Sequence, residues 1–172
     1  MQTAQTSNAA KNPSKSTSKS MRDAIDLLKA DHADLKKMYR QYKKLVDQKA
    51  DAEVRGDLAA QICHALTLHA TVEEEIFYPA ARAAIDDENV MDHADVEHAS
   101  AKDLIAQIEA IQADDSHYDA KVCVLCEYVE HHAKEEEEEM FPKVRRKLDL
   151  KELGQQISAR KAELERHFSS AE

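Results

Sequence analysis

Two segments of the chain carry a histidine, a glutamate four residues later, and a proline six residues beyond the glutamate. They are His69, Glu73 and Pro79 in the first segment, and His132, Glu136 and Pro142 in the second. In an α-helix, residues four apart lie on the same face, one turn apart. An imidazole nitrogen and a carboxylate oxygen at this spacing can point at one place, as the ligands of a metal ion do. The duplicated pair indicates a site for two metal ions.

A lone histidine precedes each pair: His32 comes before His69, and His98 comes before His132. The two separations are similar, so the chain reads as two copies of a helical hairpin. Hairpins packed about a pseudo-twofold axis would bring six polar side chains to a common centre. The predicted metal ligands are His32, His69, Glu73, His98, His132 and Glu136.

Each of these six side chains occupies a position where the surrounding pattern favours an apolar residue. Burying a neutral polar group without a partner costs about 1–3 kcal/mol, and burying a charge costs more. Six such groups would rival the ~5–15 kcal/mol that holds a domain together. Something must satisfy them, and a pair of metal ions does so directly.

Four long amphipathic segments would carry the ligands. Apolar residues recur at helical spacing from Ser20 to about residue 50, and again after Gly56-Asp57, Asn89 and Ser116, which we take as helix starts. Only 2 glycines and 3 prolines occur, which favours helix throughout. Because the breaks are short, we predict an all-α, up-down-up-down antiparallel four-helix bundle. The proline in each ligand helix removes a backbone hydrogen bond and should bend the helix.

We expect three parts along the 172 residues: a disordered tail over 1–20, the bundle over 21–148, and a C-terminal helical extension over 149–172. The tail is rich in polar residues and has no apolar run. In the extension, Asp149 can start a shorter fifth helix that crosses the end of the bundle and is interrupted near Gly154.

The chain resembles hemerythrin-like proteins of the HHE cation-binding class over residues 21 to about 148. The His-x3-Glu pairs, the following Phe77-Tyr78-Pro79 and Phe141-Pro142, and the lone histidines carry this resemblance. It implies two iron ions in a non-haem centre in the bundle core, with the four histidines as terminal ligands and the two glutamates as bridges. By ligand type, manganese or zinc would also suit the site, and iron is preferred because of the resemblance.

Two overlapping pairs in the fourth helix satisfy the spacing, His131 with Glu135 and His132 with Glu136. The second pair is favoured because His132 continues the apolar stripe and lies as far from Pro142 as His69 lies from Pro79. The remaining acids of the run 135–139 then read as a solvated face.

The oxygen-carrying hemerythrins have a fifth histidine one turn from the third-helix histidine, where this chain has Ala94 and Lys102. His93 lies on another side of that helix, and Glu97 is a further candidate ligand. The six predicted ligands leave positions on two octahedral ions unfilled. We therefore expect solvent or a small ligand to complete them, and the missing histidine favours a more reactive or labile centre over simple oxygen carriage.

Charge and cysteine content limit the partners and the compartment. The net charge is −10, and leaving out the three lysines of residues 1–20 gives −13 for residues 21–172, which argues against nucleic acid and anionic membranes. No apolar run reads as a signal peptide or a membrane span. The 3 cysteines do not form a disulfide framework, so we expect a cytoplasmic protein.

The leading functional hypothesis is a di-iron protein that binds or senses oxygen, nitric oxide or peroxide, with no protein partner identified. Binding is favoured over catalysis, no catalytic residue is assigned, and activity toward peroxide or nitric oxide is possible. Iron storage, ferroxidase activity or metal homeostasis is the alternative, although no helix places the Glu-x-x-His motif of ferritin-like centres on its core stripe. A histidine phosphotransfer bundle is disfavoured because the histidines face the core beside acids.

Overall fold

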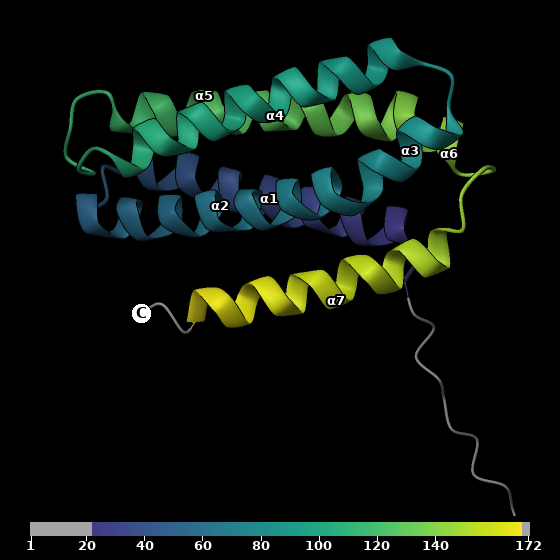
Figure 1. Ribbon diagram of the computed structural model, residues 1–172. Coiled ribbons are helices and arrows are strands. Elements are labelled where there is room, and N and C mark those ends of the chain that lie inside the picture. The colour runs from purple at the N-terminus through teal and green to yellow at the C-terminus, as the bar shows by residue number, and fades with distance from the viewer. Residues whose placement is uncertain (1–21, 170–172) are drawn as a thin grey trace, which may run out of the picture.

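The computed structural model describes residues 22–169, which form long helices joined by short turns (Figure 1). The bundle is built from α1 (Ala24–Asp47), α2 (Ala52–Val72), α4 (Glu88–Glu109) and α5 (Tyr118–Glu135). Successive helices run antiparallel, with α1 packed on α2 and α5, and α4 packed on α5 and α2. The predicted all-α up-down bundle is confirmed, and the predicted tail over 1–20 lies outside the described residues.

Several helices begin at other residues than the pattern predicted. Helix α1 begins at Ala24, where the Asp23 carboxylate accepts a hydrogen bond from the Asp26 backbone N–H at 2.9 Å. Helix α4 is capped by Asp87 instead of Asn89, because the Asp87 carboxylate accepts from the Val90 N–H. Helix α5 begins at Tyr118 without a side-chain cap.

The prediction that Gly56 opens the second helix is wrong, because α2 already begins at Ala52. A Cβ atom on Gly56 would lie 3.0 Å from the Cβ of Ala113, in the turn between α4 and α5. The glycine therefore allows the first turns of α2 to approach the turn between α4 and α5 closely. Gly56 therefore serves packing between distant segments and does not mark a helix start, which helix propensity alone cannot distinguish.

Each ligand helix widens into a π-helical turn just before its proline. Turn η1 (Glu73–Phe77) leads into α3 (Tyr78–Ala84), and turn η2 (Glu136–Met140) leads into α6 (Phe141–Val144). The backbone N–H groups of Tyr78 and Phe141 donate to the carbonyls of Glu73 and Glu136, five residues back. The predicted proline distortion thus takes the form of a π turn that begins at each predicted glutamate ligand.

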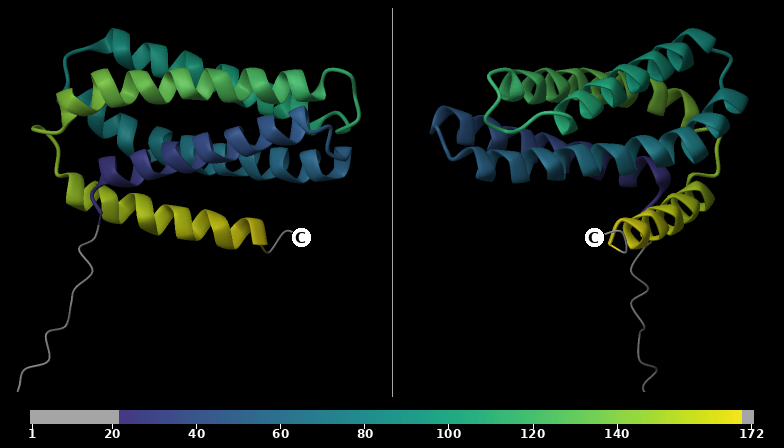
Figure 2. Two further views of the ribbon diagram at one scale, coloured as in Figure 1. Left: turned by 180° about the vertical axis from the view of Figure 1, so that it is seen from behind. Right: turned by 60° about the vertical axis from the view of Figure 1, so that its left-hand side comes forward.

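Helix α7 (Leu150–Ser169) corrects the prediction of a short, interrupted fifth helix across the bundle end. It has 20 residues, continues through Gly154 and runs along α1 and α2 (Figures 1 and 2). The predicted start is correct, because the Asp149 carboxylate accepts from the N–H groups of Lys151 and Glu152. Gly154 is needed where α7 meets the start of α1, since a Cβ there would lie 2.8 Å from the Arg22 carbonyl oxygen.

The apolar core is divided into two clusters, one at each end of the bundle. One cluster, which includes Ile25, Phe77 and Phe141, lies at the proline end, and α7 contributes Ile157 to it. The other, which includes Tyr42 and Leu125, lies at the opposite end. The described part of the chain contains no helix both long and apolar enough to cross a membrane.

Candidate metal centre

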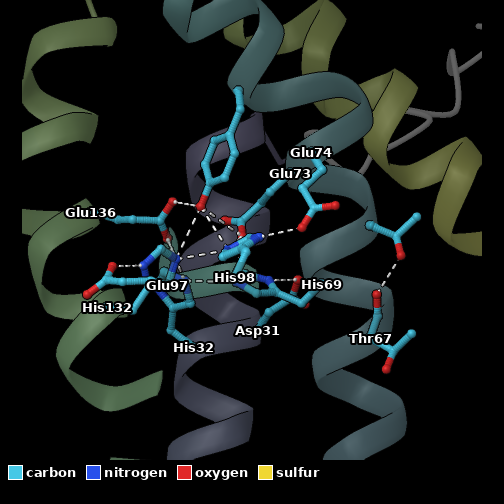
Figure 3. Close-up of polar contacts among 12 residues, drawn as sticks. Asp31, His32, Thr67, His69, Glu73, Glu74, Glu97, His98, His132 and Glu136 are labelled. Atoms are coloured by element: carbon cyan, nitrogen blue, oxygen red, sulfur yellow. Dashed lines mark hydrogen bonds and ion pairs between the residues drawn. The ribbon is translucent and has the colours of Figure 1, made fainter. Parts of the chain in front are cut away.

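All six predicted ligands are buried in one polar layer between the two apolar clusters (Figure 3). One histidine comes from each of the four bundle helices, α1, α2, α4 and α5. The two glutamates are the first residues of η1 and η2. None of the six is more than 6% exposed. Their donor atoms form two groups: His32, His69, Glu73 and Glu136 in one, and Glu73, His98 and His132 in the other.

The histidines form two equivalent pairs. The Nε2 atoms of His32 and His69 lie 3.1 Å apart, and those of His98 and His132 also lie 3.1 Å apart. Two nitrogen ligands at right angles around one ion, each about 2.1 Å from it, would be about 3.0 Å apart. The spacing within each pair therefore fits two ligands of one metal ion.

Each glutamate reaches both histidine pairs. An oxygen of Glu73 lies 3.2 Å from the Nε2 of His69 and 3.4 Å from the Nε2 of His98. An oxygen of Glu136 lies 3.2 Å from the Nε2 of His32 and 3.7 Å from that of His132. The two carboxylates thus lie between the pairs, where groups that bridge two ions would be.

The outer nitrogen of every histidine in this layer contacts a carboxylate. The Nδ1–oxygen distances are 3.0 Å for His32 with Glu137, 3.1 Å for His69 with Asp31, 2.9 Å for His98 with Glu74, and 2.6 Å for His132 with Glu97. An Nδ1–H that donates to a carboxylate orients the ring and leaves Nε2 facing inward as a ligand. All four rings are therefore held with Nε2 toward the centre.

Some inward-facing atoms have no hydrogen-bond partner in the protein. Oε1 of Glu73 and Oε2 of Glu136 are buried and receive no hydrogen bond. Leaving such atoms unsatisfied is costly, and a cation between the histidine pairs would satisfy them. The residues present therefore fit a pair of metal ions.

The pKa shifts show how the metal-free centre shares protons. Burial lowers the pKa of His69 to about 4. Burial also opposes protonation of His32, but its contacts with Glu136 outweigh this and raise its pKa to about 8. Burial and then the Glu136 carboxylate raise the pKa of Glu73. These shifts favour a proton on His32 and on Glu73 and disfavour one on His69, and metal binding would displace protons from its ligands.

Tyr78 also lies in the centre, where the sequence pattern predicted histidines and glutamates as ligands but assigned no role to this residue. Its hydroxyl donates to Oε1 of Glu136 at 2.9 Å, and lies 3.0 Å from the Nε2 of His98 and 3.1 Å from that of His132. The equivalent residue of the second hairpin is Phe141, whose ring stacks on His32. The Tyr-Pro and Phe-Pro difference was visible in the sequence and marks where the two halves of the centre differ.

The four outer carboxylates were also missed as a group, although each is next to a predicted ligand in the sequence. Glu137 was assigned to a solvated face, which is wrong because it contacts His32. Glu97 supports His132 from outside and belongs to neither of the two buried donor groups, and His93 is exposed. His131 is exposed and pairs with Glu135 at 3.2 Å, whereas His132 and Glu136 are buried.

Hollows on different sides of the bundle reach the polar layer. A cavity of about 50 Å³ is lined by His69, His98 and His132 and by apolar side chains that include Leu66 and Ile105. A larger groove of about 520 Å³ between α1 and α5 reaches His32. The smaller cavity lies against three of the four histidines and has room for a very small molecule only.

Comparisons with known proteins show the family and the fold of this chain. The model of the hemerythrin HHE cation binding domain family matches residues 23–144. A crystal structure of a hemerythrin HHE cation binding domain-containing protein from Mycobacterium kansasii is similar with a TM-score of 0.69 and 25% identity, over 84% of this chain and 88% of that chain. A DNA nickase from Nostoc sp. is 27% identical over 137 residues, which is 80% of this chain. The chain spans 38% of the length of that relative.

Proposed function

The chain belongs to the hemerythrin HHE cation-binding family, and we propose that it binds two iron ions in a carboxylate-bridged centre. His32 and His69 hold one ion, His98 and His132 hold the other, and Glu73 and Glu136 bridge them. The observation that carries this proposal is the pair of buried carboxylates that lie between two histidine pairs, each with an oxygen that has no hydrogen-bond partner.

We propose further that the centre binds oxygen, nitric oxide or peroxide. Iron supplies the redox chemistry and the coordination positions that such ligands use. On the side of His69, His98 and His132, the protein leaves room for a very small ligand only, because the cavity there measures about 50 Å³. The Tyr78 hydroxyl, which donates to Glu136 at 2.9 Å, places a hydrogen-bond donor beside the second histidine pair.

Anaerobic reconstitution with ferrous iron, followed by exposure to oxygen, tests this function. We expect elemental analysis to find two irons per chain, and oxygen to produce the near-ultraviolet and visible charge-transfer bands of a diferric centre. Two bound irons with a flat visible spectrum would contradict the ligand-binding part of the proposal. Uptake of many more irons per chain would support iron storage instead.

Metal analysis of the protein purified from its native host tests the identity of the ions. Histidine and carboxylate ligands also suit manganese and zinc, so the ligands alone do not select iron. We expect iron at two ions per chain. Manganese or zinc at the same stoichiometry would leave the metal centre in place and overturn its assignment to iron.

A further inference from the structure

A polar pocket of about 140 Å³ opens between α4 and the end of α5, above one side of the metal centre. His132 and Glu136, which are almost fully buried, line its inner end. Its other polar lining residues are Asn89, His93, Glu97, Glu135 and Glu139. The pocket therefore joins the protein surface to two predicted ligands of the buried centre.

Three side chains offer ligand atoms that converge at the edge of this pocket: Glu97 and Glu135 line it, and His131 precedes the lining residue His132. Atoms of Glu97, His131 and Glu135 lie within 4.8 Å of one another, and His131 lies 3.2 Å from Glu135. One imidazole and two carboxylates are a suitable set for a divalent cation. His131 is exposed and Glu97 and Glu135 are partly exposed, so an ion from solution can reach all three.

The equivalent surface of the first hairpin has the opposite character. His69 in the first hairpin corresponds to His132 in the second. By the same correspondence, Leu68 stands in place of His131, and Val72 stands in place of Glu135. Leu68 and Val72 are buried, and α7 packs along this side of the bundle, on α1 and α2. The two halves of the chain thus differ where they cover the centre: one half is apolar and closed, and the other is rich in metal-binding groups and open.

A buried carboxylate connects the pocket to the centre. Glu136 is 2% exposed and lines the pocket, and its oxygens lie 2.9 Å from the Tyr78 hydroxyl and 3.2 Å from Nε2 of His32 inside the centre. Glu97 belongs to the surface cluster and also contacts Nδ1 of His132 at 2.6 Å (Figure 3). A cation at the surface cluster would therefore be bound by Glu97, which itself contacts the predicted buried ligand His132.

We propose that Glu97, His131 and Glu135 form a surface site for a divalent cation, and that ions bound there enter the buried centre through this pocket. The surface site stands on its own geometry, whereas the entry route rests on the proposed function of the centre. Negative groups that line a cleft raise the local concentration of cations and can speed their association about tenfold or more.

The double variant His131→Gln/Glu135→Gln tests the site and leaves Glu97, which supports His132, unchanged. The matched control is His64→Gln/Glu165→Gln, which removes another histidine–carboxylate pair, 3.5 Å apart between α2 and α7, of a partly exposed histidine and an exposed glutamate. Titration with Mn²⁺ is followed by electron paramagnetic resonance, in protein already loaded with iron and in metal-free protein. We expect the wild type and the control to bind one Mn²⁺ that the test variant does not bind. Equal Mn²⁺ binding by all three proteins would overturn the site.

The entry route is tested by the rate at which metal-free protein takes up ferrous iron under anaerobic conditions. We expect uptake by the His131→Gln/Glu135→Gln variant to be about tenfold slower than uptake by the control, with the same final iron content. Equal rates would overturn the entry route. Failure of the wild type to retain iron would contradict the proposed centre instead. The Mn²⁺ titration of metal-free protein would then still show whether the surface site binds a cation.

Discussion

Glu73 is completely buried, and burial followed by the adjacent Glu136 carboxylate raises the pKa of its side chain. In the metal-free protein, this favours the neutral acid. Two buried carboxylates close together are costly when both are charged. The same two carboxylates become favourable ligands when cations lie between the histidine pairs, so the residues that destabilise the empty fold are those that we propose to bind metal.

Glu73→Gln should therefore separate stability from metal binding. We expect the free energy of unfolding of the metal-free protein to change by less than about 1 kcal/mol or to rise, because a neutral amide replaces a group that is favoured in its neutral form. The iron content should fall below two per chain. Denaturant unfolding of metal-free protein and elemental analysis after reconstitution measure the two effects. Full iron content in the variant would contradict the bridging role of Glu73.

The outer carboxylates should control how firmly iron is held. Asp31 contacts Nδ1 of His69 and also pairs with Lys161. Asp31→Asn keeps the shape of the side chain but loses its charge, and we expect iron affinity to fall about 10–100-fold. Asp34→Asn, an exposed position on the same helix, is the control. Competition with a chelator measures both, and equal affinities would show that Asp31 does not support the site.

At the scale of elements, α7 covers the first hairpin and contributes to the supports of the centre. Lys161 pairs with Asp31, and Arg160 donates to Glu75 at 2.7 Å. Ile157 is fully buried in the cluster at the proline end of the bundle. This helix lies beyond residues 23–144, which the family model matches, yet its side chains reach the carboxylate that holds His69.

Gly154→Ala should weaken the docking of α7. The added Cβ would lie 2.8 Å from the backbone oxygen of Arg22, and backbone cannot move aside as a flexible side chain can. We expect a loss of about 1–3 kcal/mol in the free energy of unfolding. Gln155→Ala, at an exposed position of the same helix, is the control, because it adds no atom to the contact with α1. An equal or smaller loss for Gly154→Ala than for Gln155→Ala would contradict this packing argument.

Burial in the apolar cluster at the end of the bundle away from the prolines should also make two thiols unreactive. Burial raises the pKa of Cys63 to about 11 and that of Cys126 to about 12. In the unfolded chain a cysteine thiol has a pKa of about 8.5. Above that pH the unfolded chain loses its thiol protons while the folded protein keeps them, so the stability that is fully present below about pH 8.5 is lost as the pH rises toward the folded pKa values. We expect the free energy of unfolding to decrease from pH 9 to pH 11 for this reason.

Alkylation at pH 8, followed by mass spectrometry, checks the same burial. Cys123 is partly exposed, whereas Cys63 and Cys126 are buried. We expect Cys123 to react first and the other two to react only when denaturant unfolds the bundle. Equal reaction of all three thiols in native buffer would show that the core around them opens readily.

For the whole molecule, metal binding and folding should be linked. The layer of six polar side chains separates two apolar clusters, so the two ends of the bundle meet across the centre. Ions that bind only the folded chain add about 4 kcal/mol at a concentration 1,000 times their dissociation constant. We expect iron loading to raise the midpoint of thermal unfolding, and chelation to lower it again. An unchanged midpoint would mean that the ions do not bind within the core layer.

The sequence by itself determined the helices, the antiparallel bundle and the convergence of His32, His69, His98 and His132 with two glutamates. These features depend on helical periodicity and on polar residues that interrupt apolar stripes, both of which are local properties. The resemblance to the HHE class rested on the same residues, and the family model confirms it over 23–144. The binding of iron by these residues stays a prediction.

Only the tertiary structure decided which neighbours support and cover the centre. Whether Glu137 faces solvent or His32 depends on how α5 and α1 pack, and the place of the Tyr78 hydroxyl depends on the π turn before Pro79. The course of α7 depends on contacts between residues far apart in the chain. Periodicity gives the face on which a residue lies, but the partner on that face is selected by packing and charge across helices.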